Sequence, residues 1–500
     1  MTYCPFKRDN FHVIDETAGL YYVYSPGSIT IERFENMANN IKRPNGTEDV
    51  LPKDVHKWYT IEKIARETAE SYGFSEIRIP TFESTDLYMR SVGETTDVVQ
   101  KEMYTVMAKE TKFTLRPEGT AGTIRAMLQN GLLNEAMPQR VFYILSCFRH
   151  ERPQAGRLRE FHQFGIEMAG SSSPCADAEV ISLAKTILEH LGIRNIELYI
   201  NSIGCPDCRA KYHEALREFF GARRDELCET CRTRLEKNPM RILDCKSPVC
   251  SESGKNAPII LDYLCDDCRE HFEKLQGYLK ALGIEFRINP KIVRGLDYYT
   301  KTVFEFVTTE IGAQGTVCGG GRYDGLIEEL GGQKTPALGF AMGIERLLIV
   351  MDKQGCDYLT PKKCDIYFAA MGDAALEKAM MLCKELREFG YRAEYDVVGR
   401  GLKAQMKYAN KIGAEFTMVI GDNELNDGAA KLKEMESGKE TLIRLDDKFS
   451  NNFDAIFIDK MLDSLDEAEA VKAFETAAQE YVHEHGHDCN CGCKEDGCNG

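Results

Sequence analysis

The sequence contains no apolar run that approaches the roughly 20 residues needed to cross a membrane. Its first residues lack the charged and then apolar segments that are typical of a signal peptide. An excess of positive charge is also missing, because 63 lysines and arginines face 79 aspartates and glutamates, giving a formal net charge of -16. These absences argue against a membrane protein, a secreted protein and non-specific coating of nucleic acid, although they allow a local basic surface that binds RNA. We expect a cytoplasmic protein without a membrane partner.

Cysteine, in contrast, is abundant, with 19 copies. Without a secretion signal, Cys-x-x-Cys pairs indicate metal or thiol sites rather than disulfides. Residues 205–272 contain four close pairs, three of them Cys-x-x-Cys: Cys205 and Cys208, Cys228 and Cys231, Cys245 and Cys250, and Cys265 and Cys268. These are enough ligands for two structural four-cysteine zinc sites. The alternative is that they are reduced, buried cysteines that act as small hydrophobic residues.

The most informative segment runs from Phe148 to Met168. Its first part groups arginines around a Pro/Gly turn. Its second part has the period-2 pattern of a strand, with Phe161, Gln163, Gly165 and Glu167 alternating against His162, Phe164 and Ile166. This predicts a strand, a basic loop and a return strand with polar side chains on one face. Arginine can bind phosphate bidentately, and a buried strand face with Gln and Glu is costly unless a polar group binds there.

These residues carry a resemblance to a known family. Phe148-Arg-His-Glu151 resembles motif 2 of the class II aminoacyl-tRNA synthetases. The continuation to Glu167, with Arg294-Gly-Leu-Asp-Tyr-Tyr299 downstream, is similar to the histidyl-tRNA synthetases in particular. The resemblance covers roughly residues 37 to 460 and implies an α+β protein. We expect a class II antiparallel-sheet catalytic domain with a helical insertion, followed by a C-terminal α/β anticodon-binding domain.

The segment from Val55 to Pro80 resembles motif 1 of the class. Val55 to Tyr72 has the spacing of an amphipathic helix, Gly73 ends it, and Phe74 to Pro80 alternates as a strand. In the family this motif forms the dimer interface, so the resemblance implies a homodimer. The pattern alone predicts a core helix against a sheet edge, which is compatible with that role.

Activation of an amino acid requires its carboxylate to attack the α-phosphorus of ATP, so the enzyme must hold two anions and stabilise growing negative charge. By resemblance, Arg149 contacts the α-phosphate and Glu151 contacts the adenine amino group. Arg157 would lie near the terminal phosphates. Arg346, in a segment that resembles motif 3, would bind the γ-phosphate, and Arg294 would act beside the α-phosphate as a cationic catalyst. Mg²⁺ is the usual companion of ATP in such a site.

Selection of histidine requires groups that hydrogen-bond both imidazole nitrogens, because a buried polar pocket rejects analogues that leave its own groups unpaired. Glu167 can accept from an imidazole N–H, and a tyrosine hydroxyl can complement the other nitrogen. The resemblance assigns histidine binding to Glu118, Gly119, Thr120, Gln163, Glu167, Arg294, Tyr298, Tyr299 and Tyr323. The alternative for Tyr298 and Tyr299 is a role as core aromatics with satisfied hydroxyls, but Arg294 lies in the same hexapeptide and favours the site. Gly319 to Gly321 lack the spacing of a dinucleotide loop, and we expect them to let the backbone approach the bound amino acid.

The pattern changes in residues 362–460. Strands are expected at 365–370, 392–396 and 416–420, and helices at 374–389 and 402–412. This βαβαβ order predicts a separate domain with a parallel sheet, and the segment resembles the anticodon-binding domain of the same synthetases. Lys403, Lys407 and Lys411 share one helix stripe. Such a stripe is usually a solvated face, but in an acidic chain it is a candidate contact for the tRNA backbone.

The two ends fit the family less well. Residues 1–36 show no sustained periodicity, and the segment that begins at Met37 resembles the usual N-terminus of the family. We therefore expect either a misassigned start codon or a real N-terminal arm. Residues 461–500 combine an acidic helix pattern with alternating His and Cys, which predicts a disordered tail that binds metal opportunistically. The remaining expected domains are the catalytic domain at 37–204 and 273–352, the Cys-rich insertion at 205–272, and the anticodon-binding domain at 362–460.

Together these features predict an enzyme that ligates L-histidine to tRNA(His). The reaction would use ATP, pass through a histidyl-adenylate, and release AMP and diphosphate. The alternative is a synthetase-like regulatory subunit of ATP phosphoribosyltransferase in histidine biosynthesis. Such subunits typically lack the anticodon domain and lose the Arg294 to Tyr299 pattern, whereas this chain keeps both.

Overall fold

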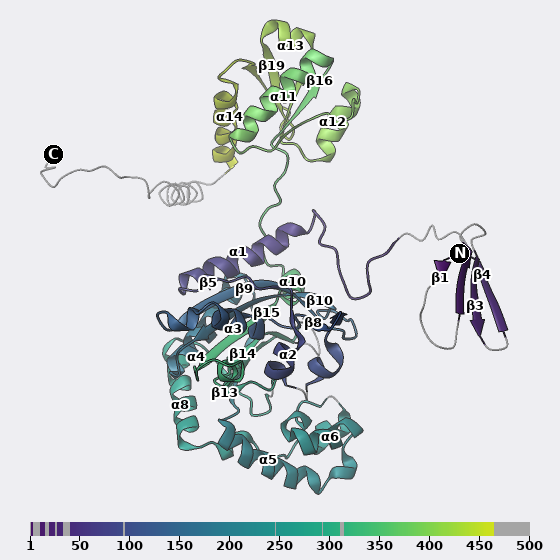
Figure 1. The fold of residues 1–500 in the computed structure, drawn as a ribbon. Helices are drawn as coiled ribbons and strands as arrows, with labels where there is room; N and C mark the ends of the chain where they lie inside the picture. Colours follow the sequence, from purple (N-terminus) through teal and green to yellow (C-terminus); the bar gives the residue numbers. More distant parts are fainter. Residues whose placement is uncertain are drawn as a thin grey trace, which may run out of the picture. The chain divides into compact units, whose positions relative to one another are not determined.

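The computed structural model describes residues 41–464, apart from 94–95, 246, 293 and 311–314, and within residues 1–40 it describes four strands. Two compact units, Met1–Leu359 and Thr360–Gly500, are each described separately (Figure 1). The N-terminal strands form an antiparallel sheet in chain order: β1 (Thr2–Tyr3), β2 (Phe11–Asp15), β3 (Leu20–Ser25) and β4 (Ser28–Arg33). The sequence pattern did not predict them.

An eight-stranded sheet forms the centre of the first unit, in the order β12-β11-β13-β14-β15-β10-β9-β5. Its strands are β5 (Ser75–Glu76), β9 (Gln139–Phe148), β10 (Glu160–Ala169), β11 (Glu197–Ser202), β12 (Arg287–Ile288), β13 (Thr300–Val307), β14 (Thr316–Arg322) and β15 (Ala337–Gly343). Neighbours are antiparallel, except that β5 and β12 join the two edges in parallel. The predicted antiparallel catalytic sheet is confirmed.

The predicted strand, basic loop and return strand are β9, residues 149–159 and β10. The two strands pair antiparallel, with Gln163 opposite Leu145 and Glu167 opposite Val141. Phe164 and Ile166 on β10 are fully buried in the main hydrophobic core. Because successive side chains of a strand point to opposite faces, Gln163 and Glu167 are turned to the other face of the sheet.

Four helices supply the apolar side chains that pack on that core: α1 (Val55–Ser71), α4 (Pro174–His190), α8 (Asp266–Ala281) and α10 (Ile344–Gln354). The helix predicted from Val55 is thus confirmed, with Ile61 and Ala65 buried. The strand predicted from Phe74 to Pro80 is shorter, because β5 comprises only Ser75–Glu76. It pairs only at the sheet edge, and the Ile77 N–H makes one further bond to Phe142 O before the chain turns away.

Three short helices and a small sheet complete the rim of the catalytic domain. These are α2 (Thr85–Val92), α3 (Thr120–Gln129) and α9 (Leu326–Glu329), with the three strands β6 (Phe82–Ser84), β7 (Thr105–Ala108) and β8 (Thr111–Leu115). Glu118 accepts hydrogen bonds from the N–H groups of Thr120 and Ala121, so its carboxylate caps the start of α3.

The insertion is helical, as expected from its sequence (Figure 1). It contains α5 (Pro206–Gly221), α6 (Glu229–Lys237), the 3₁₀ turn η4 (Pro239–Ile242) and α7 (Pro248–Ser253). Helix α8 crosses the expected domain boundary at residue 272, because it starts beside Cys265 and buries Leu275 and Leu279 in the catalytic core. The end of the insertion is therefore continuous with the core.

The second unit contains a five-stranded sheet in the order β17-β16-β18-β19-β20. Its elements are β16 (Ile366–Ala370), α11 (Asp373–Glu388), β17 (Ala393–Tyr395), α12 (Leu402–Lys411), β18 (Phe416–Ile420), α13 (Asp422–Asp427), β19 (Ala429–Glu434), β20 (Glu440–Arg444) and α14 (Phe449–Ser464). The predicted βαβαβ order is present, and β16, β17 and β18 are parallel. The sheet as a whole is mixed, because β19 and β20 add an antiparallel pair that was not predicted. The histidines and cysteines of the tail lie outside the described residues.

Among the described residues, none of the helices combines the length and the apolar character needed to cross a bilayer. This agrees with the absence of a long apolar run in the sequence.

The largest fully buried side chain is Arg322, at the end of β14. Its guanidinium lies 2.6 Å from a carboxylate oxygen of Asp177 on α4, and it also donates to the carbonyls of Ser171 and Ser173. Burial alone would raise the pKa of Asp177, but the charges and hydrogen bonds of Arg322 and His271 together lower that pKa. The pair fixes the end of β14, immediately before Tyr323.

We expect Arg322→Leu to lower the free energy of unfolding by about 3–5 kcal/mol, because it removes the cation that pairs with Asp177 in the interior and leaves only His271 near that carboxylate. Urea unfolding at neutral pH measures this effect. The double change Arg322→Leu with Asp177→Leu should regain much of the loss, whereas Lys384→Ala in an exposed ion pair should cost less than about 0.5 kcal/mol. A loss below about 1 kcal/mol for Arg322→Leu would contradict this role of the pair.

Candidate active site

A cavity of about 420 Å³ lies on the face of the sheet that carries Gln163. Eleven residues selected from the sequence line it: Glu118, Thr120, Arg149, Glu151, Arg157, Gln163, Arg294, Tyr298, Tyr299, Tyr323 and Arg346. They come from segments far apart in the chain, from α3 to α10. Glu167 accepts a hydrogen bond from Tyr323, which lines the cavity, and Gly119 lies in the chain between the lining residues Glu118 and Thr120.

Glu167 is buried at the floor of the site, with 1% of its surface exposed. The hydroxyl of Tyr323 donates to one carboxylate oxygen, and the hydroxyl of Tyr143 donates to the other at 3.0 Å. Burial raises the pKa of Glu167 to about 8, even though these hydrogen bonds favour the charged form. The facing residue on β15 is Gly339, where a Cβ would lie 2.1 Å from the carboxylate.

Tyr143 on β9 was not selected from the sequence. It is fully buried, and it lies opposite Gly165 in the β9–β10 register. A Cβ at Gly165 or at Gly119 would come within 2.4 Å of its ring, so both glycines are needed for this tyrosine to reach Glu167. Gly119 therefore has a structural role, and it also lies close to the predicted histidine site.

Three tyrosines form an aromatic wall. The ring centroids of Tyr298 and Tyr299 are 4.7 Å apart, and that of Tyr323 lies 5.5 Å from Tyr298. All three side chains are nearly buried, yet they line the cavity. Such rings with polar tips suit a flat ligand that also forms hydrogen bonds.

Arg294 lies beside this wall, with its guanidinium 5.6 Å from the centre of the Tyr299 ring. It forms an ion pair with Glu305 of β13, a residue that the sequence reasoning missed. Burial alone would lower the pKa of Arg294, but the neighbouring Glu305 carboxylate raises it. The guanidinium therefore stays charged. Among the described residues, the Arg294 Nε–H has no hydrogen-bond partner. A buried donor without a partner is costly, which indicates that a ligand completes it.

The glycines of β14 leave space for Arg294 and for the backbone of the adjacent strand β15. A Cβ at Gly319 would come within 2.5 Å of the Arg294 guanidinium, and a Cβ at Gly320 would come within 2.2 Å of the Gly339 carbonyl. The glycine-rich strand therefore makes room for Arg294 and for the adjacent strand, and Gly319 also lines the cavity, so its approach to a bound amino acid stays a prediction. Its place between β13 and β15 confirms that it is not a dinucleotide loop.

Three arginines gather at the other end of the cavity. Arg149 donates to the Pro117 carbonyl and lies over Phe161, and Arg346 donates to the carbonyls of Gly156 and Thr316. Arg157 pairs with Glu151 at 2.9 Å. Burial, and after it the charge of Arg157, lowers the pKa of Arg346. Cations held together against their mutual repulsion form a site for a polyanion such as a triphosphate.

The other sequence-selected residues lie elsewhere. Lys403, Lys407 and Lys411 are exposed along α12 of the second unit, as their spacing predicted. The eight cysteines of the insertion form two groups of four. Asp244, from the insertion, also lines the cavity and was not anticipated.

Comparisons with known proteins agree with this geometry. The family model of histidyl-tRNA synthetase matches residues 46–218 and 255–347, and that of the anticodon binding domain matches residues 365–450. The histidine–tRNA ligase of Acetivibrio thermocellus is 52% identical over 404 residues, which cover 81% of this chain and 97% of the relative. That of Clostridium novyi is 53% identical over 417 residues, with 83% and 98% covered.

Among solved structures, the apo histidyl-tRNA synthetase of S. aureus superposes with a TM-score of 0.71 at 38% identity. The match covers 83% of this chain and 99% of the S. aureus chain. The fold, the family models and the curated relatives thus agree with the predicted family. The chain belongs to the histidyl-tRNA synthetases, the class II histidine–tRNA ligases.

Proposed function

We propose that this chain ligates L-histidine to tRNA(His), using ATP and forming a histidyl-adenylate that releases AMP and diphosphate. The observation that carries the proposal is a single cavity with two unlike ends. One end holds the arginines Arg149, Arg157 and Arg346, and the other holds Arg294 and the tyrosine wall above Glu167. A triphosphate and an amino acid bound at these ends would meet at Arg294.

In the first step, Glu118 and Thr120 would hold the α-amino group of histidine, and Gln163 would face its carboxylate. Burial raises the pKa of Glu118, and an ammonium ion there would favour its charged form. The imidazole would lie between Glu167 and the aromatic wall formed by Tyr298, Tyr299 and Tyr323. Each polar group then has a partner, which is how a buried pocket excludes other side chains.

The carboxylate of histidine would attack the α-phosphorus, and diphosphate would leave. Arg149 and Arg294 would stabilise the negative charge that grows on the α-phosphate oxygens, since fixed cations in a water-poor site act without reorganisation. Arg157 and Arg346 would bind the leaving diphosphate, and Glu151 would accept from the adenine amino group. Release of Glu151 from Arg157 would accompany ATP binding, because the two are paired in the structure.

Glu345 presents carboxylate oxygens at the wall of the cavity, a donor type that fits Mg²⁺. Mg²⁺ held there would neutralise part of the charge of ATP. Glu345 is oriented by the backbone N–H of His162 and lies 2.9 Å from the His162 ring.

Three further assignments belong to this proposal. The chain would act as a homodimer through the motif 1 segment Val55 to Pro80, and in the cytoplasm, where its substrates are. The insertion would bind structural zinc through its cysteines. The alternative role as a regulatory subunit of ATP phosphoribosyltransferase is not favoured, because the chain keeps both the anticodon-binding domain and the complete Arg294 to Tyr299 segment.

Charging of tRNA tests the ligase proposal. The purified chain, given ATP, Mg²⁺ and labelled histidine, should charge a tRNA(His) transcript and leave transcripts for other amino acids uncharged. Transfer of label to none of them by folded protein would contradict the proposal.

The basic stripe of α12 gives a separable expectation. Changing Lys403, Lys407 and Lys411 together to Glu should weaken tRNA charging roughly 10-fold or more, mainly through the KM for tRNA and with a reduced dependence on salt. Histidine-dependent ATP–pyrophosphate exchange without tRNA should be unchanged. Glu changes at Lys431 and Lys433, on β19 of the same unit, and at Lys439, just before β20, are the matched control. Equal loss of both activities would contradict a role in tRNA binding.

A further inference from the structure

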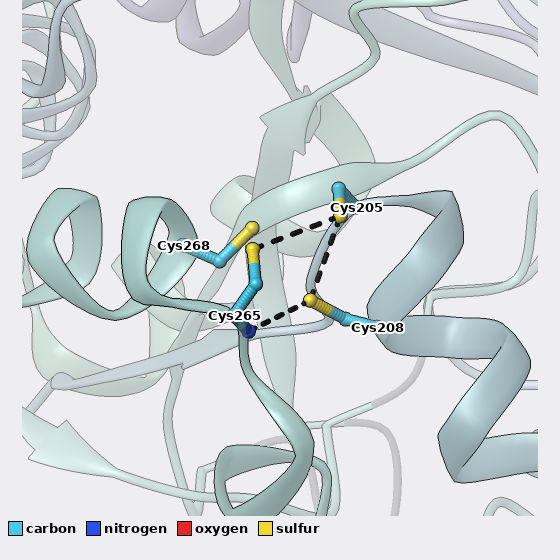
Figure 2. A group of neighbouring side chains, drawn as sticks. All are labelled: Cys205, Cys208, Cys265 and Cys268. Carbon is cyan, nitrogen blue, oxygen red and sulfur yellow. Dashed lines mark hydrogen bonds between the residues drawn. The ribbon is translucent and has the colours of Figure 1, made fainter.

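The eight cysteines of the insertion form two nested groups. The outer group joins Cys205 and Cys208 to Cys265 and Cys268 (Figure 2), and the inner group joins Cys228 and Cys231 to Cys245 and Cys250. In each group all four sulfur atoms lie within 4.8 Å of one another. The outer group thus closes the insertion at its two ends, and the inner group lies inside it.

The sulfur spacing fits a single tetrahedral ion. Sγ atoms are 3.5 Å apart for Cys205 and Cys208, 4.0 Å for Cys205 and Cys265, and 3.9 Å for Cys228 and Cys245. Four thiolates at about 2.3 Å from a central zinc would be about 3.8 Å apart. A disulfide would bring two sulfurs to about 2.0 Å, and a multi-iron cluster would hold its thiolates on separate irons, farther apart.

The backbone supports thiolates at both groups. Cys205, Cys228 and Cys265 are each the N-cap of a helix, where the positive end of the helix dipole stabilises a thiolate. The N–H of Cys265 donates to Cys208 Sγ at 3.1 Å, and the N–H of Cys228 donates to Cys250 Sγ at 3.3 Å. Packing of inert hydrophobic cysteines would not require these bonds.

An arginine follows each Cys-x-x-Cys pair and offsets the net charge of -2 that four thiolates and one Zn²⁺ would carry. Arg232 donates to the Leu227 carbonyl and Arg269 to the Leu264 carbonyl, each closing its own turn. Arg209 instead donates to the carbonyl of Tyr299, in the aromatic wall of the cavity, at 3.0 Å. Arg209, which follows Cys208 directly in the chain, therefore links the outer group to the proposed histidine pocket.

The inner group reaches the same segment by a second route. Arg241, on the turn η4 between the inner pairs, is only 8% exposed. Its guanidinium donates to Asp297 at 2.8 Å and to the Gly295 carbonyl at 2.8 Å, and Asn238 also donates to Asp297. Asp244, next to Cys245, lines the cavity itself.

We infer that each group binds one Zn²⁺ ion and that the two ions hold Arg209 and Arg241 against the segment from Arg294 to Tyr299. Arg209 and Arg241 are positioning residues, because they contact the backbone and Asp297 of that segment rather than the substrates. Zinc would thereby be required for tight binding of histidine, a consequence that rests on the proposed function.

Metal analysis of the full chain, purified under reducing conditions from zinc-supplied cells, tests the first part. Because the tail carries further His and Cys residues, the ions are counted as differences between variants. Cys228→Ser with Cys245→Ser should lose one zinc per chain, Cys205→Ser with Cys265→Ser should lose one, and the four changes together should lose two. Cys175→Ser, an exposed cysteine outside both groups, should lose none. Unchanged zinc in the double variants, or iron in place of zinc, would overturn the assignment.

The coupling is tested by Arg241→Gln, which keeps all eight cysteines. It should retain both ions and raise the KM for histidine roughly tenfold in ATP–pyrophosphate exchange, with little change in the KM for ATP. Amide exchange in residues 294–299 should become faster. Lys255→Gln, an exposed cation of the same insertion, should change neither. An unaltered KM for histidine in Arg241→Gln would overturn the coupling. Exchange by the zinc-free wild-type chain with an unaltered KM for histidine would overturn the requirement for zinc while leaving the ligase proposal standing.

Discussion

Arg294→Gln is expected to lower the kcat of histidine-dependent ATP–pyrophosphate exchange by about 10²–10³-fold, the usual effect of removing one group that stabilises charge in a transition state. Arg294 lines the cavity beside the tyrosine wall, and its Nε–H has no hydrogen-bond partner within the described part of the chain. The KM values should change less than kcat, because the charge it stabilises grows during the reaction.

The loss has a second origin that a double variant separates. Without Arg294, the carboxylate of Glu305 keeps Thr316 as a partner but loses its ion pair. Its uncompensated negative charge would then repel the phosphates of ATP. Arg294→Gln with Glu305→Gln should therefore recover a part of the activity, whereas Arg287→Gln, an exposed arginine on β12, should leave kcat unchanged. A loss of less than tenfold in Arg294→Gln would show that this arginine is not a catalytic residue.

Glu167→Gln should reduce kcat/KM for histidine by roughly 10²-fold, equivalent to about 3 kcal/mol for a buried charged hydrogen bond. The variant keeps the size of the side chain, so the effect reports charge rather than packing. The KM for ATP should stay within about threefold of the wild type, since the arginine end is untouched. Tyr143→Phe removes only one of the two hydroxyls that donate to Glu167 and should have a smaller effect. Unaltered kcat/KM for histidine in Glu167→Gln would place the imidazole elsewhere.

The same residue sets the pH dependence of histidine binding. With the pKa of Glu167 raised to about 8 by burial, and imidazole at its ordinary value of about 6.5, the free carboxyl is protonated and the free ring is neutral between these two values. The complex then holds one shared proton, so binding neither takes up nor releases protons in this window. Above about pH 8 binding must take up a proton, and the KM for histidine should rise up to tenfold per unit. The alkaline limb should disappear in Glu167→Gln.

The face of the sheet that bears the site was predictable from the sequence because its signal is local. Polar residues on β10 alternate with the buried residues Phe164 and Ile166. Burying such polar side chains costs free energy unless they are hydrogen-bonded, so this pattern predicts a bound polar ligand. The resemblance then selected Arg294 and Arg346 on distant segments, and the cavity brings them together. Their individual roles remain proposals that the variants above examine.

Residues whose role depends on register were missed. Tyr143 belongs to an apolar run on β9 that has no alternation, so nothing in the sequence marks the face to which it points. Glu305 lies between the buried residues Phe304 and Phe306 of β13, so alternation places it on the opposite face, and nothing in the sequence marks the cation that it meets there. The pairing of cysteines into nested groups was likewise open, since spacing gives the number of ligands but not their partners.

The most direct measurement is ATP–pyrophosphate exchange by the purified chain with Mg²⁺, tested against each of the twenty amino acids without tRNA. Exchange with histidine alone is expected, because only imidazole satisfies Glu167 together with the tyrosine hydroxyls. Exchange with a different amino acid would contradict the assignment of the pocket. Absence of exchange from folded protein would contradict the ligase itself and would favour the regulatory-subunit alternative.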